Sequence, residues 1–155
     1  MASLQFFKVQ TEWTGNLGTG TNQVRSYSRD HTCMISGKPP LQLSTGNLAV
    51  GESSRFNPED LLVSAISSCH LLTYLYLCAC EGIVITAYRD DAEGIMEEVS
   101  SGGGQFSEVC LKPRMRLLDP KQKQRAIQLH EAAHAQCIIA RSLNFRVRCE
   151  PVCED

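Results

Sequence analysis

One long stretch limits the folds open to this chain, NPEDLLVSAISSCHLLTYLYLCACEG at residues 57–82. Asn57 suits a helix N-cap and Pro58 suits the first helical position. Two acidic residues follow in the first turn, where the helix dipole favours negative charge. Gly82 suits the residue that ends a helix in the left-handed conformation. The sequence therefore predicts a single long helix across this stretch.

The middle of this predicted helix carries no Asp, Glu, Lys or Arg from Leu61 to Cys80. A run of this length matches a membrane span, which needs about 20 apolar residues. Serine, cysteine and histidine interrupt the run and no basic clusters flank it, which argues against a membrane. A helix apolar on nearly all sides is also typical of a buried one. Because one small domain can hardly cover a helix of about 36 Å on every face, we predict a homodimer with this helix at its centre and no membrane partner.

Strand-like alternation of apolar and polar residues lies on both sides of the helix. Strands are predicted over residues 4–12, 22–36, 41–46 or 47–51, 83–90, 94–101, 106–118 and 144–152. The first two form a predicted hairpin and the three after the long helix a predicted antiparallel meander. A second helix is predicted over 121–142, after Asp119-Pro120. The fold class is therefore α+β with a mostly antiparallel sheet, and we predict a single domain over residues 1–155.

Charge and cysteine content narrow the function further. Fifteen basic residues against seventeen acidic ones give a net charge of −2, which argues against a nucleic-acid or anionic-lipid partner. The first residues lack the pattern of a secretory signal, so we expect a cytoplasmic protein. Eight cysteines occur without a regular disulfide framework, and in a reducing compartment most are expected to be thiols used in packing. We assign no role to Cys149 and Cys153.

Cys69, in the middle of the predicted long helix, is the strongest candidate for chemistry. A thiol reacts as its thiolate, and among apolar side chains it stays inert unless a cation stands beside it. Cys69 lies about three turns from the helix start, too far for the helix dipole to help. The candidate cations are His70, which adjoins it in sequence, and Arg25 and Arg29, which share one face of the predicted strand over 22–36. The residues alone leave these candidates open.

A metal site is the alternative chemistry. His130, His134 and Cys137 lie at i, i+4 and i+7 on one face of the second predicted helix, and Cys69 or His70 would supply a fourth zinc ligand. No CxxC pair supports this reading, and histidines near a helix surface are commonly just solvated. We therefore predict no metal and no bound cofactor.

Two motifs resemble a known family. NPEDLLVSAISSCH at 57–70 and HAQCIIARSLNFRV at 134–147 are similar to the two cysteine regions of the OsmC/Ohr family, the osmotically induced and organic hydroperoxide resistance proteins. EWTGNLGTGT at 12–21, RSYSRDH at 25–31 and the order of predicted strands and helices support the resemblance. The chain departs from the family at Ser68-Cys69-His70, where small residues and an aromatic residue usually surround the cysteine.

This resemblance implies an intertwined homodimer and a thiol-dependent peroxidase that reduces organic hydroperoxides to alcohols, an antioxidant enzyme of the oxidative stress response. It implies that Cys69 is the peroxidatic cysteine and Cys137 the resolving one. An arginine of the early strands and a glutamate at the helix start complete the family's site. Here Glu59 matches the glutamate, and we select Arg29 as the arginine, with Arg25 as the alternative. An external dithiol reductant, such as a lipoyl-type dithiol, would reset the two cysteines.

Ten residues separate Glu59 from Cys69, or about 15 Å along a straight helix. Either the arginine bridges a bent helix, or Glu59 and its arginine reach Cys69 from the other subunit, and we predict the second. Two rival functions use the same residues. The first is a non-catalytic thiol redox sensor or small apolar-ligand-binding dimer, and the second is a zinc-binding structural protein.

Overall fold

The computed structural model describes residues 4–46, 51–98, 100 and 102–154. Its internal contacts group the chain into two compact units, residues 1–61 (unit 1) and residues 62–155 (unit 2). The predicted single domain over 1–155 stays a prediction. Of the two stretches predicted for the third strand, 47–51 falls almost wholly outside the described residues.

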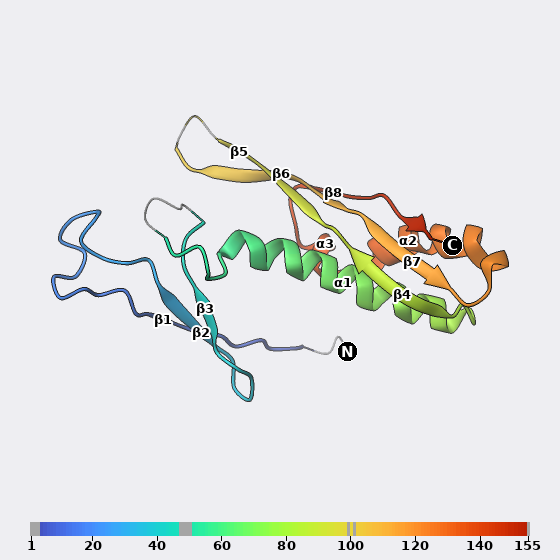
Figure 1. The fold of residues 1–155 in the computed structure, drawn as a ribbon, viewed down its shortest axis with the longest axis horizontal. Coiled ribbons are helices and arrows are strands. Elements are labelled where there is room, and N and C mark those ends of the chain that lie inside the picture. Colours follow the sequence, from blue (N-terminus) through green and yellow to red (C-terminus); the bar gives the residue numbers. More distant parts are fainter. Residues whose placement is uncertain (1–3, 47–50, 99, 101, 155) are drawn as a thin grey trace. The chain divides into compact units, whose positions relative to one another are not determined.

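Unit 1 contains a small antiparallel sheet in the order β1-β2-β3 (Figure 1). Its strands are β1 (Gln10–Trp13), β2 (His31–Met34) and β3 (Leu41–Leu43). Trp13 pairs with His31, so the predicted hairpin is confirmed, with strands shorter than the alternation suggested. The Trp13 indole donates a hydrogen bond to the Ser28 carbonyl at 2.8 Å and meets the Tyr27 ring edge-on. These contacts hold the connection between β1 and β2 against the first strand.

The segment before β2 is not a strand, which corrects the prediction for 22–36. Turns replace the expected strand there because side chains bind the backbone locally. The Ser26 hydroxyl donates to the Gln23 carbonyl at 2.9 Å, and the Arg29 guanidinium donates to the Val24 and Tyr27 carbonyls. Arg25 and Arg29 therefore do not share a strand face.

The long helix α1 (Pro58–Cys80) begins and ends where its caps predict. The Asn57 side chain accepts a hydrogen bond from the Asp60 backbone N–H at 2.7 Å, and the Asp60 carboxylate accepts one from the Asn57 N–H at 3.3 Å. This reciprocal arrangement satisfies two N–H groups that the helix leaves unpaired. At the other end Gly82 has φ of +68°, which a glycine adopts without strain.

Against the other described residues, α1 buries one stripe of side chains. Its buried residues are Ile66, His70, Tyr74 and Cys78, spaced four apart. Leu72 is 67% exposed and Tyr76 66%, so the described residues leave an apolar face of α1 uncovered. By length and composition α1 could cross a membrane, and 22% of its most apolar window is buried. Because the same helix also forms the core of unit 2, its composition alone does not make it a membrane span.

Strands β4 to β9 form two three-stranded sheets in unit 2, in the orders β4-β7-β9 and β5-β6-β8. Their bounds are β4 (Ile85–Asp90), β5 (Glu93–Glu98), β6 (Gly104–Leu111), β7 (Pro113–Leu117), β8 (Arg146–Cys149) and β9 (Val152–Cys153). β4 pairs with β7 and β5 with β6, both antiparallel, whereas β8 and β9 add parallel strands. The predicted meander is therefore wrong in its order, while the mostly antiparallel α+β class is confirmed.

The strand predicted over 106–118 is broken at Lys112. The Lys112 N–H donates to the Asp90 carboxylate at 2.7 Å, and Pro113 has no N–H to donate. The other Asp90 oxygen accepts a hydrogen bond from Ser67 of α1 at 2.5 Å. Asp90 thus stabilises the break and links it to α1.

The second helical region is also broken, which corrects the continuous helix predicted over 121–142. It consists of a 3-10 turn, η1 (Pro120–Gln122), followed by α2 (Lys123–Gln136) and α3 (Ile138–Arg141). Between α2 and α3, Cys137 has an extended backbone with ψ of 111°. Cys137 therefore does not continue the helix face that carries His130 and His134.

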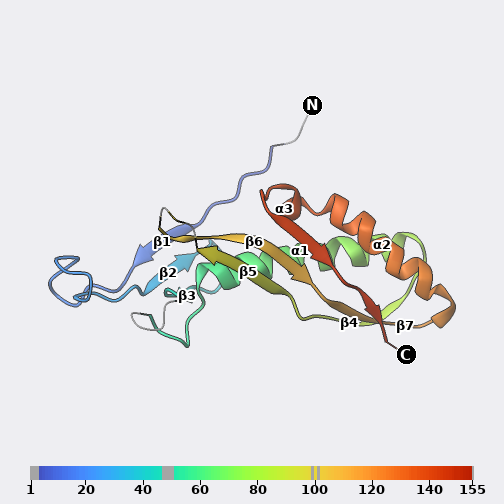
Figure 2. The ribbon, with the colours of Figure 1, turned by 90° about the horizontal axis from the view of Figure 1, so that it is seen from above.

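Two apolar clusters form the core of unit 2. One joins the second half of α1 to β7 and α2 through Tyr74, Met115 and Leu129. The other joins the first half of α1 to β6 through Ile66 and Val109. Figure 2 shows α2 running beside α1. His70 lies in the α1 stripe between the residues that anchor the two clusters.

Candidate functional site

The structure brings the two predicted catalytic thiols together within one chain. Cys69 is half-buried on α1, and Cys137 is 1% exposed at the break between α2 and α3. The Cys69 side chain lies close enough to act on the pKa of the Cys137 thiol. No disulfide joins any two cysteines of the described residues, so both are present as thiols.

The two thiols differ in their surroundings. Burial, and then the hydrogen bond with Cys69, raises the pKa of the Cys137 thiol to about 11. The backbone N–H of Ala140 donates to the Cys137 sulfur at 3.5 Å, which only partly offsets this rise. Cys137 is therefore protonated near neutral pH and can donate a hydrogen bond to the Cys69 sulfur.

A small cavity adjoins this part of α1. It has a volume of about 380 Å³ and is lined by Ser64, Ser67 and Ser68 of the helix together with Leu71 and Asp90. Ser68 directly precedes Cys69, although Cys69 itself does not line the cavity. The lining mixes hydroxyl and apolar groups around one carboxylate, a surface suited to a small molecule with a polar end and an apolar end.

The predicted activating residues lie in unit 1, whereas both thiols lie in unit 2. Arg29 donates to the Tyr27 carbonyl at 2.9 Å and to the Val24 carbonyl at 2.5 Å, with its guanidinium 4.2 Å from the Tyr27 ring centre. Arg25 is exposed and has no ion pair among the described residues. One Glu59 carboxylate oxygen is buried and has no hydrogen-bond partner in the described part of the chain.

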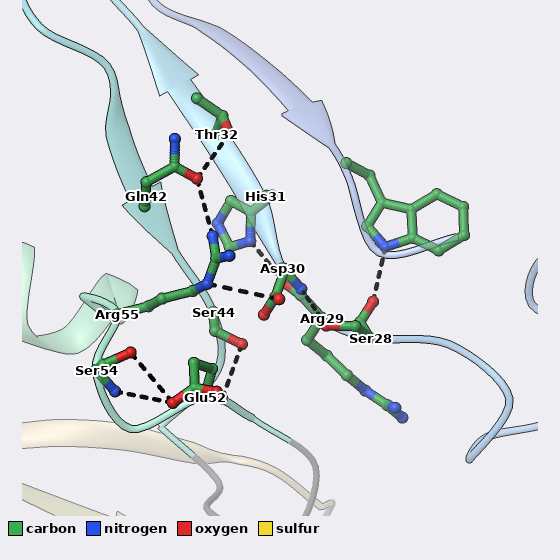
Figure 3. A network of polar contacts seen from close by, with 11 residues as sticks. Ser28, Arg29, Asp30, His31, Thr32, Gln42, Ser44, Glu52, Ser54 and Arg55 are labelled. Carbon is green, nitrogen blue, oxygen red and sulfur yellow. Dashed lines mark hydrogen bonds and ion pairs between the residues drawn. The ribbon is translucent and has the colours of Figure 1, made fainter. Parts of the chain in front are cut away.

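Arg55, which the sequence did not single out, makes the charged contacts near Arg29. Its guanidinium lies 3.5 Å from the Asp30 carboxylate and donates to the Gln42 side chain at 2.8 Å (Figure 3). Figure 3 shows the Arg29 side chain turned away from this network. In unit 1, then, Asp30 pairs with Arg55 and not with Arg29.

A second cluster, which the sequence did not reveal, joins His70, His130 and Cys149. The Nε2 atom of His70 lies 2.8 Å from Nδ1 of His130, and the Cys149 sulfur lies 3.6 Å and 3.8 Å from these two nitrogens. We name these three residues the His-His-Cys cluster. The zinc alternative was predicted from His130, His134 and Cys137 with Cys69 or His70 as a fourth ligand. Of these residues His130 and His70 belong to the cluster, and Cys149 takes the place of the others. The sequence held one sign of this cluster. His70 lies four residues after Ile66 and four before Tyr74, which places it on the buried face of α1.

Burial sets the charge state of this cluster. It lowers the pKa of His70 to about 4, with the Asp90 carboxylate opposing that shift, and it lowers the pKa of His130 to about 3. Burial also raises the pKa of the Cys149 thiol to about 12. All three side chains are therefore neutral near pH 7.

An aromatic ring packs against the His-His-Cys cluster, and a cavity adjoins it. The Tyr74 ring stacks on His130, with ring centres 3.8 Å apart and planes inclined by 16°. A cavity of about 420 Å³ is lined by His130 and Cys149, and also by Glu131 and His134. The outer ring nitrogens, Nδ1 of His70 and Nε2 of His130, have no hydrogen-bond partner among the described residues.

Known structures share this fold. An OsmC-like protein of unknown function from Vibrio cholerae superposes with a TM-score of 0.86 at 25% identity, covering 96% of this chain and 100% of its own. An organic hydroperoxide resistance protein of Elizabethkingia anophelis gives 0.70 at 16% identity, covering 100% and 99%. The organic hydroperoxide resistance protein OhrB of Bacillus subtilis gives 0.63 at 18% identity, covering 97% and 100%. No curated protein matches the sequence.

The sequence itself matches a family model described as OsmC-like protein over residues 51–151. This range contains Cys69 and Cys137, the last part of unit 1 and nearly all of unit 2. It confirms the resemblance drawn from the two cysteine motifs. The chain belongs to the OsmC-like protein family.

Proposed function

We propose that this protein is a cysteine-based thiol peroxidase that reduces organic hydroperoxides to alcohols. The observation that carries the proposal is the contact between Cys69 and Cys137, with Cys137 held protonated as the donor. A peroxidatic and a resolving cysteine need this proximity to form a disulfide. The organic hydroperoxide resistance proteins among the similar structures support the substrate class.

In the proposed first step the Cys69 thiolate attacks the distal oxygen of the hydroperoxide. The O–O bond breaks, and the leaving alkoxide takes a proton and departs as the alcohol. Cys69 is thereby oxidised to a sulfenic acid. Cys137 then attacks the Cys69 sulfur, its thiol proton and the sulfenic hydroxyl leave together as water, and a Cys69–Cys137 disulfide forms.

An external dithiol resets the enzyme by thiol–disulfide exchange and leaves as its own disulfide. A lipoyl-type dithiol is our candidate, because one molecule supplies both reducing thiols. No bound cofactor takes part in this cycle. We place the enzyme in the cytoplasm as an antioxidant in the response to oxidative stress, where reductants keep its thiols reduced between turnovers.

We further propose that Arg29 activates Cys69 and that Glu59 orients this arginine, with Arg25 as the alternative. A guanidinium stabilises a thiolate and the negative charge on the leaving oxygen, and a carboxylate binds it in a bidentate pair. The unpartnered Glu59 oxygen supports this role, since it needs a donor. Replacing Arg29 by Gln should slow peroxide reduction about 100-fold. If Arg25→Gln slows it equally and Arg29→Gln leaves the rate unchanged, the role belongs to Arg25.

A homodimer built on α1 is part of the proposal. The exposed apolar residues Leu72, Leu75 and Tyr76 of α1 form a face that a second copy would cover. The second subunit would also supply Glu59 and its arginine to each Cys69. Sedimentation should show a dimer in parent protein and a shift to monomer in Tyr76→Glu. A monomeric variant with full peroxidase activity would sink the shared site.

The central experiment compares the parent protein with Cys69→Ser, using cumene hydroperoxide and hydrogen peroxide in the presence of a dithiol. We expect the parent to consume cumene hydroperoxide faster, and the variant to lose activity by about 1,000-fold or more. Equal consumption by the variant would reject the enzyme. Fast formation of the Cys69–Cys137 disulfide without sustained turnover would instead indicate a thiol redox sensor.

A further inference from the structure

We propose that the His-His-Cys cluster binds one divalent transition-metal ion, for which zinc is the best match. His70 Nε2, His130 Nδ1 and the Cys149 sulfur all lie within 4.8 Å of one another. Two imidazoles and one thiolate are a ligand set that zinc takes readily. The proposal uses neither Cys69 nor Cys137, so it stands apart from the proposed peroxidase cycle.

The distances are close to those that a tetrahedral ion requires. Zinc bonds of about 2.0–2.1 Å to nitrogen and 2.3 Å to sulfur place two nitrogens about 3.3 Å apart and a sulfur about 3.6 Å from a nitrogen. The Cys149 sulfur lies 3.6 Å and 3.8 Å from the histidine nitrogens. The nitrogens lie 2.8 Å apart and must separate by about 0.5 Å.

The ligands come from three regular elements and not from loops. His70 lies on α1, His130 on α2 and Cys149 at the end of β8. The histidines are 1% and 2% exposed, and the Tyr74 ring packs flat against His130. Their positions are therefore fixed by the packing of unit 2 before any ion binds, which reduces the ordering cost of binding.

The charges near the cluster also suit a cation. A divalent ion with one thiolate leaves one positive charge in a buried place. The Asp90 carboxylate acts electrostatically on both His70 and Cys149. It can offset this remaining charge without serving as a ligand, because its two oxygens already bind Ser67 and the Lys112 N–H.

Three protein ligands leave a fourth coordination position open. The cavity of about 420 Å³ that His130 and Cys149 line gives an ion and a water molecule a way in. An open fourth position is typical of zinc sites that exchange their outer ligand, unlike closed structural sites.

The hydrogen-bond partners of the ligand side chains affect how strongly the ion binds. Metal-bound histidines usually donate their other N–H to a partner, and losing such partners costs about 10–100-fold in affinity. Nδ1 of His70 and Nε2 of His130 lack partners among the described residues. We therefore expect an exchangeable ion, about 10–100-fold weaker than a site with a complete outer shell, so that titration is a better test than the metal content after purification.

The test is a Co²⁺ titration of the full-length protein after treatment with a chelator and under reducing conditions. We expect one Co²⁺ per chain, with thiolate-to-cobalt charge-transfer absorption and the intense visible bands of a four-coordinate ion, and Zn²⁺ should displace it. Cys149→Ser should lose the charge-transfer absorption and weaken binding at least about tenfold. His130→Gln should weaken binding similarly, with circular dichroism confirming that each variant is folded.

Matched controls locate the ion. His31→Gln removes a histidine of β2 in unit 1, and the double variant Cys69→Ser/Cys137→Ser removes the neighbouring thiol pair. Both should keep the charge-transfer absorption and the affinity of the parent. Absence of thiolate absorption in the parent would overturn the proposal. So would its survival in Cys149→Ser or its loss in the double variant, since either result would place the ion elsewhere.

Discussion

Cys69 and His70 are neighbours on α1, yet they belong to sites of different character. Cys69 is half-buried and meets Cys137 at a break between two helices. His70 is 1% exposed and meets His130 and Cys149, each held in a regular element. Consecutive residues on a helix point about 100° apart, so one helix can serve two sites at the same level. The surroundings, and not the position along α1, decide what each residue can do.

The difference matches what the two proposed activities require. A disulfide requires two sulfurs to approach to about 2.05 Å and to separate again in each cycle. Cys137 lies where the backbone leaves the helical conformation, so it can move without straining α2. A ligand cluster instead gains from rigidity, and the stacked Tyr74 ring and two surrounding cores supply it.

The largest expected effect separates the two thiols of the pair. Cys137→Ser should still let Cys69 form one sulfenic acid, which a dimedone label and mass spectrometry would detect. Turnover with a dithiol should fall about 100-fold or more, because the disulfide cannot form. Cys80→Ser, at the exposed end of α1, is the control and should keep parental turnover. Parental turnover in Cys137→Ser would remove its resolving role.

The next effect concerns stability, and it should be larger for a substitution in the His-His-Cys cluster than for one in the thiol pair. His70→Ala breaks a buried hydrogen bond and leaves a cavity, so we expect a loss of about 2–4 kcal/mol in the free energy of unfolding. Cys69→Ala, in the half-buried thiol pair, should lose about 1 kcal/mol or less. Urea unfolding monitored by circular dichroism measures both. Equal losses would show that the His-His-Cys cluster is no more rigidly packed than the thiol pair.

A third prediction concerns how stability depends on pH in chelator-treated protein. His70 and His130 have pKa values of about 4 and about 3 when folded, against 6.5 in the unfolded chain. The unfolded chain therefore binds more protons below pH 6.5, and the free energy of unfolding should fall as the pH drops from 6.5 towards 3. Asp90 opposes the fall in the pKa of His70, whereas His134 adds to it. His70 in turn adds to the fall in the pKa of His130.

Urea unfolding of the parent and of His70→Gln/His130→Gln across this range checks the prediction. In the double variant, the free energy of unfolding should depend less steeply on pH, because the contribution of these two histidines is absent. Identical slopes would mean that both histidines take up protons in the folded protein as readily as in the unfolded one.

Local signals made part of the fold predictable. Asn57, Pro58 and Gly82 fixed the ends of α1, because capping depends on residues close in sequence. The breaks at Lys112 and Cys137 escaped prediction. The first depends on the Asp90 carboxylate, which reaches Lys112 from β4, and the alternation of apolar residues does not report such a contact.

The candidate site divides in the same way. Its cysteines were recognisable because each lies in a motif of the family. The His-His-Cys cluster was not, because His70 and His130 are 60 residues apart and His70 and Cys149 are 79 apart. Only the packing of β8 and two helices brings them together. The strand predicted to carry Arg29 does not form, because the Arg29 side chain binds backbone carbonyls there. The alternation of apolar and polar residues gives no sign of such contacts.

The placement of Trp13 gives the protein a built-in reporter. It is the chain's single tryptophan, and its indole is fixed in unit 1 by the Ser28 carbonyl and the Tyr27 ring. Unit 2 contains Tyr74, Tyr76 and Tyr88 and no tryptophan. Fluorescence excited at the red edge of the ultraviolet band therefore follows unit 1 alone, while tyrosine circular dichroism is weighted towards unit 2. Melting curves from the two signals would reveal directly whether the two units lose their structure in one cooperative transition.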